Sequence, residues 1–431
     1  MRRKISTGIK KLISTGFVHI FGANTLNQVL SFLSSIVLVR VLTKADYGCF
    51  SYALNIYQFF LLLSGLGISS GILQMCSEYS DKPEKSKIIY DWGSTFGIKV
   101  NVLLSVCILV VGLFVPISIE GTNELLVCFC ALPIFTLIYE MAIAKMRGDI
   151  KAKEYSYSNI VNMVLYCGLS ILGAIIMASK GLIFGRYLAY ILTSIFIAIT
   201  FHVFPSFKKV KLENGIKMPL LKVSLISVVN NGLSTLFNLL EVFILGIVVS
   251  DSTVTASYKV ATTIPAALNF VPLAFAVYVY PYFAKHIGDS KWIRKNYLRS
   301  LLGLGAINGA IAIILIIIAT PLVHIVFGTQ YADSVILFRI LVVGYFIGGT
   351  FRVLSGNLLV SQRKLLYNTL VAIVGCVISI VANVILIPRH GSLGAAWAHI
   401  CVLTITGILN TGGMMYFINR KKVEGNGNET V

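Results

Sequence analysis

Four basic residues lie in the predicted outer halves of long apolar runs, where a positive charge could bind an anion. They are Arg40, Arg186, Lys259 and Arg339. A charge at the centre of a bilayer costs at least about 2.5–3.5 kcal/mol on insertion scales, so such residues usually serve a function or reach a polar edge. A guanidinium can hold two phosphate oxygens at once. The four residues therefore predict either a substrate-binding cavity for a phosphate or another anion, or side chains that snorkel to the nearer surface.

Two carboxylates also fall within apolar runs, at Glu241 and Glu140. A carboxylate withdrawn from water takes up a proton more readily, so either residue could couple transport to an ion, H+ or Na+. Pairing with a basic neighbour is the alternative for both. Glu140 is the weaker candidate because it lies near the predicted cytoplasmic end of its run.

Two stripes of polar side chains follow helical spacing, each on one face of its predicted helix. The first stripe is Asn24, Gln28, Ser31 and Ser35, and the second is Asn230, Ser234, Asn238 and Glu241. Polar residues of this kind can simply hydrogen-bond neighbouring helices. Because similar stripes recur in both halves, we predict that the amides Asn24, Gln28, Asn230 and Asn238 line a substrate cavity.

Enzyme chemistry has no support in the sequence. It contains no P-loop, no CxxC pair and no metal-ligand cluster. The predicted external loops are too short for a catalytic domain. We therefore expect a protein that is not an enzyme and that needs no cofactor or metal.

The composition places these residues in a membrane protein. Of the 431 residues, 57% are hydrophobic and only 12% are charged, whereas about a quarter is charged in soluble domains. The net charge of +19 would suggest nucleic-acid binding in a soluble protein. Here the positive charges lie mostly in loops, so we interpret them as topology signals and expect no nucleic-acid partner.

The positions of the apolar runs predict an all-α polytopic membrane protein with twelve transmembrane helices in two six-helix lobes. The predicted spans lie near residues 18–41, 49–75, 93–115, 123–144, 156–178, 182–204, 222–250, 256–284, 297–319, 333–359, 366–387 and 392–418. With the amino terminus inside, 27 basic residues fall in cytoplasmic segments and only Lys44, Lys180 and Arg389 fall outside. Both termini are therefore predicted to be cytoplasmic. Lys99 and Arg352 lie in the cytoplasmic halves of their spans, where snorkelling explains them.

Local patterns repeat about 210 residues apart. KADYGCFSYALNI resembles DSTVTASYKVATTI, and KGLIFGRYLAY resembles HGSLGAAWAHI. We predict an N-terminal lobe at 1–207, a cytoplasmic inter-lobe loop at 208–221, a C-terminal lobe at 222–418 and a cytoplasmic tail at 419–431. Parallel repeats with a substrate site between them are typical of transporters.

From about Gly22 to Tyr416 the sequence resembles the polysaccharide flippases of the Wzx type, in the superfamily that also holds multidrug extruders and lipid II flippases. The resemblance is carried by SFLSSIVLVRVLTKADYGCFSYAL, IPRHGSLGAAWAHI and the basic turn SQRKLLYN, echoed by MRGDIKAKEYSYSN. It implies two six-helix lobes and alternating access in the bacterial inner membrane. The implied substrate is an undecaprenyl-pyrophosphate-linked oligosaccharide that crosses to the outer leaflet for O-antigen or capsule synthesis.

Two other functions remain open at this point. A cation-coupled drug antiporter of the same superfamily would favour acidic residues in its cavity. A surface-polysaccharide polymerase or ligase would need long external loops with catalytic Arg or His, and these loops are missing from the prediction.

Overall fold

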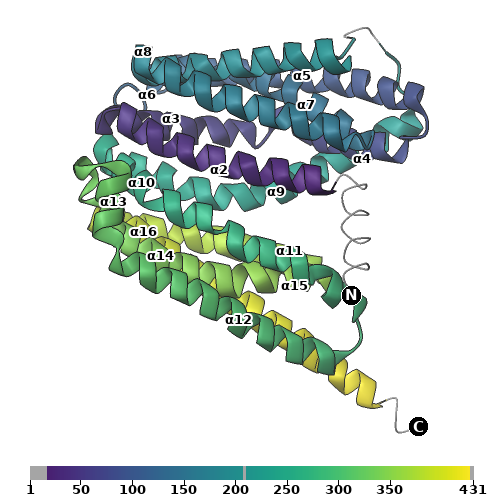
Figure 1. The fold of residues 1–431 in the computed structure, drawn as a ribbon, viewed down its shortest axis with the longest axis vertical. Coiled ribbons are helices and arrows are strands. Elements are labelled where there is room, and N and C mark those ends of the chain that lie inside the picture. The colour runs from purple at the N-terminus through teal and green to yellow at the C-terminus, as the bar shows by residue number, and fades with distance from the viewer. Residues whose placement is uncertain (1–16, 207–209, 428–431) are drawn as a thin grey trace, which may run out of the picture. The chain divides into compact units, whose positions relative to one another are not determined.

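The computed structural model describes residues 17–206 and 210–427, and within them every element is helical (Figure 1). The chain divides into two compact units, Met1–Thr235 and Leu236–Val431. The dividing point lies inside helix α9 (Asn214–Val249), which itself begins within the predicted inter-lobe loop. The lobe boundaries drawn from the sequence therefore remain a prediction, and each unit is described by itself below.

In the part of the first unit that the structure describes, seven α-helices and a short 3-10 turn precede α9. They are α2 (Phe17–Val41), α3 (Lys44–Leu61), η1 (Ser64–Gly67), α4 (Ile68–Glu78), α5 (Pro83–Phe114), α6 (Thr122–Phe129), α7 (Leu132–Gly148) and α8 (Ala152–Phe201). Its main apolar core lies between α4, α5, α7 and the start of α9, around Ile72, Ile89 and Met141. Helix α2 packs along α8, and this pairing forms the wall used by the polar pocket described below.

The second unit continues from the end of α9. Its elements are α10 (Ser252–Leu268), α11 (Phe270–Lys285), α12 (Ser290–Ile317), α13 (Ala319–Phe327), η2 (Thr329–Tyr331), α14 (Ser334–Ile347), the π-helical turn η3 (Gly348–Val353), α15 (Leu354–Ser361) and α16 (Leu365–Gly427). Its core lies between α11, α12, α15 and α16 and includes Phe283, Tyr297 and Leu358. Helix α14 packs against both α10 and α16, which brings these three elements together.

Polar caps fix where α3 and α10 begin. The Thr43 hydroxyl accepts a hydrogen bond from the backbone N–H of Asp46 at 3.1 Å, and the Asp251 carboxylate accepts one from Thr253 at 2.7 Å. Each cap satisfies a donor that the first helical turn leaves free. Since the two helices occupy corresponding places in the two units, the caps give a register for comparing them.

Helix α8 is broken at Met177 and Ala178, which have φ/ψ values of −136°/27° and 47°/−135°. On either side of the break the backbones nearly touch, because a Cβ added at Gly173 would lie only 2.0 Å from the carbonyl oxygen of Gly181. Glycine at both positions permits this approach. The 50 residues therefore form a tight hairpin of two helices.

Helix α16 has the same design. Its break is at Gly391, with φ 56° and ψ −133°, and a Cβ at Gly394 would lie 2.2 Å from the carbonyl oxygen of Leu386. In both hairpins the glycine that allows the contact follows the break by three residues. The predicted divisions near 178–182 and 387–392 thus coincide with real breaks in the helices.

Seven helices in the described part of the chain are long and apolar enough to cross a bilayer, and two bent helix pairs raise the number to nine. In this count α8 and the apolar part of α16 stand as single helices of 50 and 56 residues, although about 20 residues cross the hydrocarbon layer. Large apolar side chains such as Phe114, Ile176 and Leu366 are strongly exposed. The fold is that of a multi-pass α-helical membrane protein, and the number of twelve spans stays a prediction.

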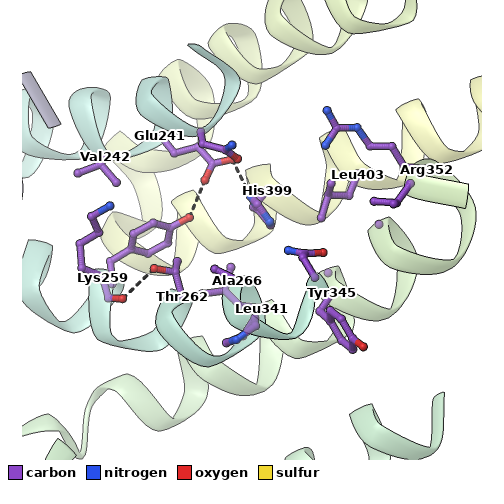
Figure 2. Close-up of a pocket in the computed structure, with 17 residues that line it drawn as sticks. Glu241, Val242, Lys259, Thr262, Ala266, Leu341, Tyr345, Arg352, His399 and Leu403 are labelled. Carbon is purple, nitrogen blue, oxygen red and sulfur yellow. Dashed lines mark hydrogen bonds and ion pairs between the residues drawn. The ribbon is translucent and has the colours of Figure 1, made fainter. Parts of the chain in front are cut away.

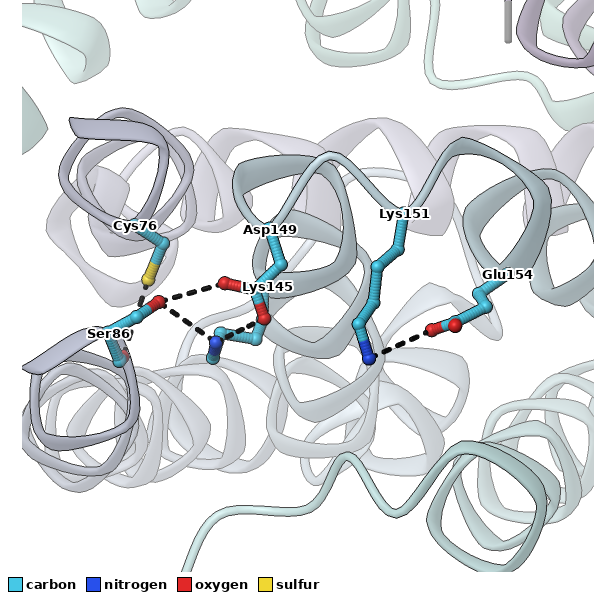
Figure 3. Close-up of polar contacts among 6 residues, drawn as sticks. All are labelled: Cys76, Ser86, Lys145, Asp149, Lys151 and Glu154. Carbon is cyan, nitrogen blue, oxygen red and sulfur yellow. Dashed lines mark hydrogen bonds and ion pairs between the residues drawn. The ribbon is translucent and has the colours of Figure 1, made fainter. Parts of the chain in front are cut away.

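A buried polar cluster ties α4, α5 and α7 together at one end of the first unit (Figure 3). Lys145 on α7 forms an ion pair with Asp149, and both bond the Ser86 hydroxyl, Lys145 Nζ at 2.9 Å and Asp149 Oδ1 at 2.8 Å. The Cys76 thiol of α4 donates to the Ser86 carbonyl at 3.5 Å. Each of these polar groups has a partner within the cluster, so the buried charges have a structural explanation and indicate no functional site.

Candidate functional site

A cavity of about 470 Å³ lies within the second unit, where α9, α10, α14, η3 and α16 meet. Its walls carry the ionisable side chains Glu241, Lys259, Arg352 and His399, shown in Figure 2, together with Tyr258 and Asn238. Small and apolar residues such as Gly344 and Leu403 complete the lining. Because the surrounding helices are apolar, so many ionisable groups around one cavity indicate a functional site.

Glu241 is the centre of this arrangement. Its side chain is almost completely buried, with 3% exposed. The Tyr258 hydroxyl of α10 donates to Glu241 Oε2 at 3.0 Å, and His399 Nδ1 of α16 lies 2.7 Å from Glu241 Oε1. An ionised carboxylate accepts only, so the imidazole donates from Nδ1 in that state. One carboxylate from α9 thereby joins two other helices.

Two basic side chains share the cavity with this carboxylate. Lys259 directly follows Tyr258 in α10, and Arg352 lies in the π-helical turn η3. In Figure 2 they lie on either side of Glu241 and His399. When both are protonated, the cavity is positively charged even if the histidine is neutral. Such a cavity suits a substrate with a phosphate or another anionic group.

The geometry of η3 explains why Arg352 points into the cavity. A π-helical turn inserts an extra residue into a helix and is often found at functional sites. Gly348 and Gly349 stand at its start, where added Cβ atoms would lie 3.2 Å from Leu403 and 3.1 Å from Asn308 and Pro272. Close packing on both sides therefore fixes the turn that carries Arg352.

Three of the residues predicted from the sequence come together here: Asn238, Glu241 and Lys259. Three others were not predicted as site residues: Tyr258, Arg352 and His399. Arg352, for which snorkelling was the explanation offered by the sequence, lines the cavity as well.

A second pocket, of about 430 Å³, lies within the first unit between α2 and α8. Its lining consists of Asn24, Asn27, Gln28, Ser31, Asn162, Met163, Tyr166 and Tyr190. Asn24 and Gln28 were predicted as cavity residues, and they do line this pocket. None of its eight lining residues carries a charge, so its chemistry differs from that of the second unit.

Arg186 lies beside this pocket and is 8% exposed. Its guanidinium carbon lies 4.9 Å from the ring centroid of Phe50 and 5.0 Å from that of Tyr166. Its Nε has no hydrogen-bond partner within the described structure. Contact with two aromatic faces partly offsets the burial of the cation. Arg186 is therefore held by rings, and Tyr166 connects it to the pocket.

The remaining predicted residues lie outside both cavities. Arg40, at the end of α2, Arg339 and Glu140 are exposed, and Arg339 Nη2 donates to Thr320 Oγ1 at 3.3 Å. The side chain of Asn230 lies outside the described residues. A role for any of the four in binding or ion coupling stays a prediction.

The two units place corresponding residues at their sites. Counted from the caps Thr43 and Asp251, Phe50 and Tyr258 occupy the same position, and counted from the breaks at Ala178 and Gly391, so do Arg186 and His399. Arg186 packs over Phe50, whereas Glu241 joins His399 to Tyr258. The sequence patterns KGLIFGRYLAY and HGSLGAAWAHI, aligned end to end, pair Arg186 with Ala396 instead, three residues out of register.

The chain is similar to known proteins in sequence. A family of polysaccharide biosynthesis proteins matches residues 37–336. An uncharacterized membrane protein in the cps region of Klebsiella pneumoniae is 25% identical over 418 residues, which cover 92% of this chain and 80% of that protein.

The fold is similar to solved transporter structures. An inward-facing multidrug resistance MATE family transporter of the MOP superfamily matches with a TM-score of 0.71 and 13% identity, over 92% of this chain and 95% of that one. The lipid II flippase MurJ in an inward closed conformation matches with a TM-score of 0.66 and 15% identity, over 93% and 87%. At these identities the likeness concerns the fold.

Proposed function

Because this chain belongs to the family of polysaccharide biosynthesis proteins, we propose that it is a flippase for lipid-linked oligosaccharides. It moves undecaprenyl-pyrophosphate-linked repeat units from the inner to the outer leaflet by alternating access, for O-antigen or capsule synthesis. In this proposal the protein lies in a bacterial cytoplasmic membrane with both termini on the cytoplasmic side.

The observation that carries the proposal is the positively charged cavity of the second unit. Lys259 and Arg352 line it together with Asn238. Two basic side chains beside a single carboxylate favour an anionic ligand in the same cavity. A pyrophosphate offers several oxygens to an arginine and a lysine, and it is the charged part of the proposed substrate. A drug antiporter for cations would gain nothing from this charge.

The pair of Glu241 and His399 supplies a coupling element for the same cycle. A proton taken up by this pair changes the net charge of the cavity, and with it the affinity for an anion. We therefore take the coupling ion to be H+, with Na+ as the alternative that ion replacement would reveal.

The proposal is tested in a strain that lacks this protein and any redundant flippase. Undecaprenyl-pyrophosphate oligosaccharide should accumulate and surface polysaccharide should disappear. The wild-type gene should reverse both effects, and the double variant Lys259→Gln/Arg352→Gln should not. Arg339→Gln is the matched control, since it removes a cation outside the cavity and should restore the polysaccharide. Unchanged lipid-linked sugar in the deletion strain would overturn the proposal and favour the drug antiporter.

A further inference from the structure

We infer that the uncharged pocket of the first unit is a separate subsite that binds the sugar hydroxyls of the substrate. The inference rests on the proposed function, since the sugar hydroxyls are those of the proposed substrate. The pocket concerned lies between α2 and α8, within the first unit.

The lining of this pocket has the chemistry of a carbohydrate site. Four amide side chains (Asn24, Asn27, Gln28 and Asn162), a serine hydroxyl and two tyrosines surround about 430 Å³. An amide both donates and accepts, as a sugar hydroxyl does, so neutral amides match hydroxyl groups without preferring a charged ligand. An anion would find no cation in this lining, and a cationic drug would find no carboxylate.

One edge of the pocket is fixed by a hydrogen-bond network. The Asn24 Oδ1 accepts from the Tyr155 hydroxyl at 3.1 Å and from Asn159 Nδ2 at 3.4 Å. Asn27 Nδ2 donates to the Asn159 carbonyl at 3.4 Å, and Tyr139 donates to Asn159 Oδ1 at 3.1 Å. These bonds hold α2 against α8 and orient two amides before any ligand arrives.

The same network leaves acceptors without partners. The Oδ1 atoms of Asn27 and Asn162 are buried and have no hydrogen-bond partner in the described structure. A buried acceptor without a donor is unfavourable by about the free energy of a lost hydrogen bond, so such atoms call for an explanation. Both residues line the pocket. A neutral, hydroxyl-rich ligand supplies the missing donors.

Aromatic rings supply the apolar part of the site. Tyr166 and Tyr190 line the pocket with ring centroids 5.8 Å apart in an edge-on arrangement, and Tyr139 lies 5.6 Å from Tyr190. Arg186 covers the Tyr166 ring at 5.0 Å and holds it in place. The C–H faces of a pyranose pack on such rings, while its hydroxyls reach the amides. Arg186 therefore acts as a positioning residue for Tyr166.

The test compares two lipids on the purified full-length protein in detergent. One is undecaprenyl pyrophosphate, and the other is the same lipid carrying the oligosaccharide that accumulates in the deletion strain. The wild type should bind the glycosylated lipid more tightly. Asn162→Leu and Gln28→Leu should each lower affinity for this lipid by about 3- to 10-fold, the value of one uncharged hydrogen bond, and leave the bare lipid unchanged. Gln28 is exposed, so its variant keeps the fold even where the buried Asn162 variant does not.

The controls separate this subsite from the proposed function. Gln74→Leu removes an exposed amide of the same unit outside the pocket and should change neither affinity. Arg352→Gln should weaken both lipids equally. If the wild type prefers the glycosylated lipid and the pocket variants keep that preference, the sugar subsite is refuted while the flippase stands. A wild type that binds neither lipid overturns both.

Discussion

Glu241 and His399 are 158 residues apart in the chain, yet Glu241 Oε1 and His399 Nδ1 lie 2.7 Å from each other within the second unit. The contact joins α9 to the part of α16 that follows its break at Gly391. Glu241 is 3% exposed, so water competes little with this bond. A change of charge at either residue therefore acts directly on how two helices are held together.

Transport should depend on pH through this pair. The groups that face Glu241 in the cavity are Tyr258 and Lys259 from α10, Arg352 from η3, Tyr345 from α14 and His399 from α16. We expect the translocation rate in proteoliposomes to change with pH. Glu241→Gln should weaken this dependence and lower the rate at least about tenfold, because a neutral amide loses the charge-assisted bonds to Tyr258 and His399.

Glu140→Gln tests the other predicted coupling carboxylate in the same experiment. Glu140 lies on α7 outside both cavities, so coupling through Glu241 predicts that this variant keeps the wild-type pH profile. A Glu241→Gln protein that still responds to pH would place the coupling group elsewhere. Replacing Na+ by K+ at constant pH should leave the wild-type rate unchanged if the coupling ion is H+.

Affinity for the pyrophosphate lipid should depend more on whether a basic residue lines the cavity than on how deep it lies in an apolar run. Lys259→Gln and Arg352→Gln each remove a cation from the cavity lining. A hydrogen bond to a charged group contributes about 1.5–3 kcal/mol, so affinity for the pyrophosphate lipid should fall by about 10- to 150-fold. Arg40→Gln and Arg339→Gln should change it less than about twofold. Equal losses in all four variants would contradict the cavity as the binding site.

Sequence reasoning found the part of this site that depends on charge and helical spacing. Glu241 and Asn238 lie on one predicted stripe, and Lys259 is a charge within an apolar run. Both features can be recognised from neighbouring residues in the sequence. Arg352 is also a charge within an apolar run, but its predicted cytoplasmic depth allowed snorkelling, and His399 gave no signal. Arg352 is turned into the cavity by η3, and a π-helical turn follows from packing around Gly348 and Gly349 rather than from a sequence motif.

The position of His399 could have been found from the internal repeat. Its register is set by where each hairpin breaks, and the first unit breaks at Ala178, a residue type that ordinarily continues a helix. The second unit breaks at Gly391, which is recognisable. If the break at Ala178 is not recognised, the two patterns are aligned by their similar residues alone. Arg186 is then paired with Ala396, three residues before His399. The helical class of the fold, by contrast, follows from the apolar runs alone.

The buried ion pair at one end of the first unit should contribute to stability. Lys145 and Asp149 have side chains 10% and 21% exposed. Lys145→Met leaves Asp149 without its partner, and we expect a loss of up to about 3 kcal/mol in the free energy of unfolding. Lys145→Met/Asp149→Leu should recover part of it, because the uncompensated charge is gone.

The neighbouring pair in Figure 3 provides the control for that experiment. Lys151 Nζ lies 3.3 Å from Glu154 Oε2, and their side chains are 43% and 32% exposed. Lys151→Met should change stability by less than about 1 kcal/mol, as is usual for exposed pairs. Chemical unfolding in detergent measures all three variants, and a double variant less stable than Lys145→Met would contradict the role of the buried charge.

The two hairpin breaks predict substitutions with opposite effects. Ala178 has φ 47° and ψ −135°, and Gly391 has φ 56° and ψ −133°, so both adopt a conformation that disfavours residues with a Cβ. Ala178→Gly should therefore raise stability by about 0.5–1 kcal/mol, and Gly391→Ala should lower it by about 1–2 kcal/mol. A Cβ at Gly391 would have no atom within 4 Å, so the loss reflects backbone conformation and not a clash.

Two further glycines of α16 provide reference substitutions, one with a steric clash and one without. Gly394→Ala places its Cβ 2.2 Å from the carbonyl oxygen of Leu386 and should destabilise the hairpin more than Gly391→Ala, since the two helices must separate. Gly412 has no atom within 4 Å of an added Cβ, and Gly412→Ala should be neutral or stabilising because alanine favours a helix. Thermal unfolding of the four variants in one detergent gives the order. If Ala178→Gly lowers stability, the left-handed conformation of Ala178 does not destabilise the first hairpin. The two breaks then do not share one backbone constraint.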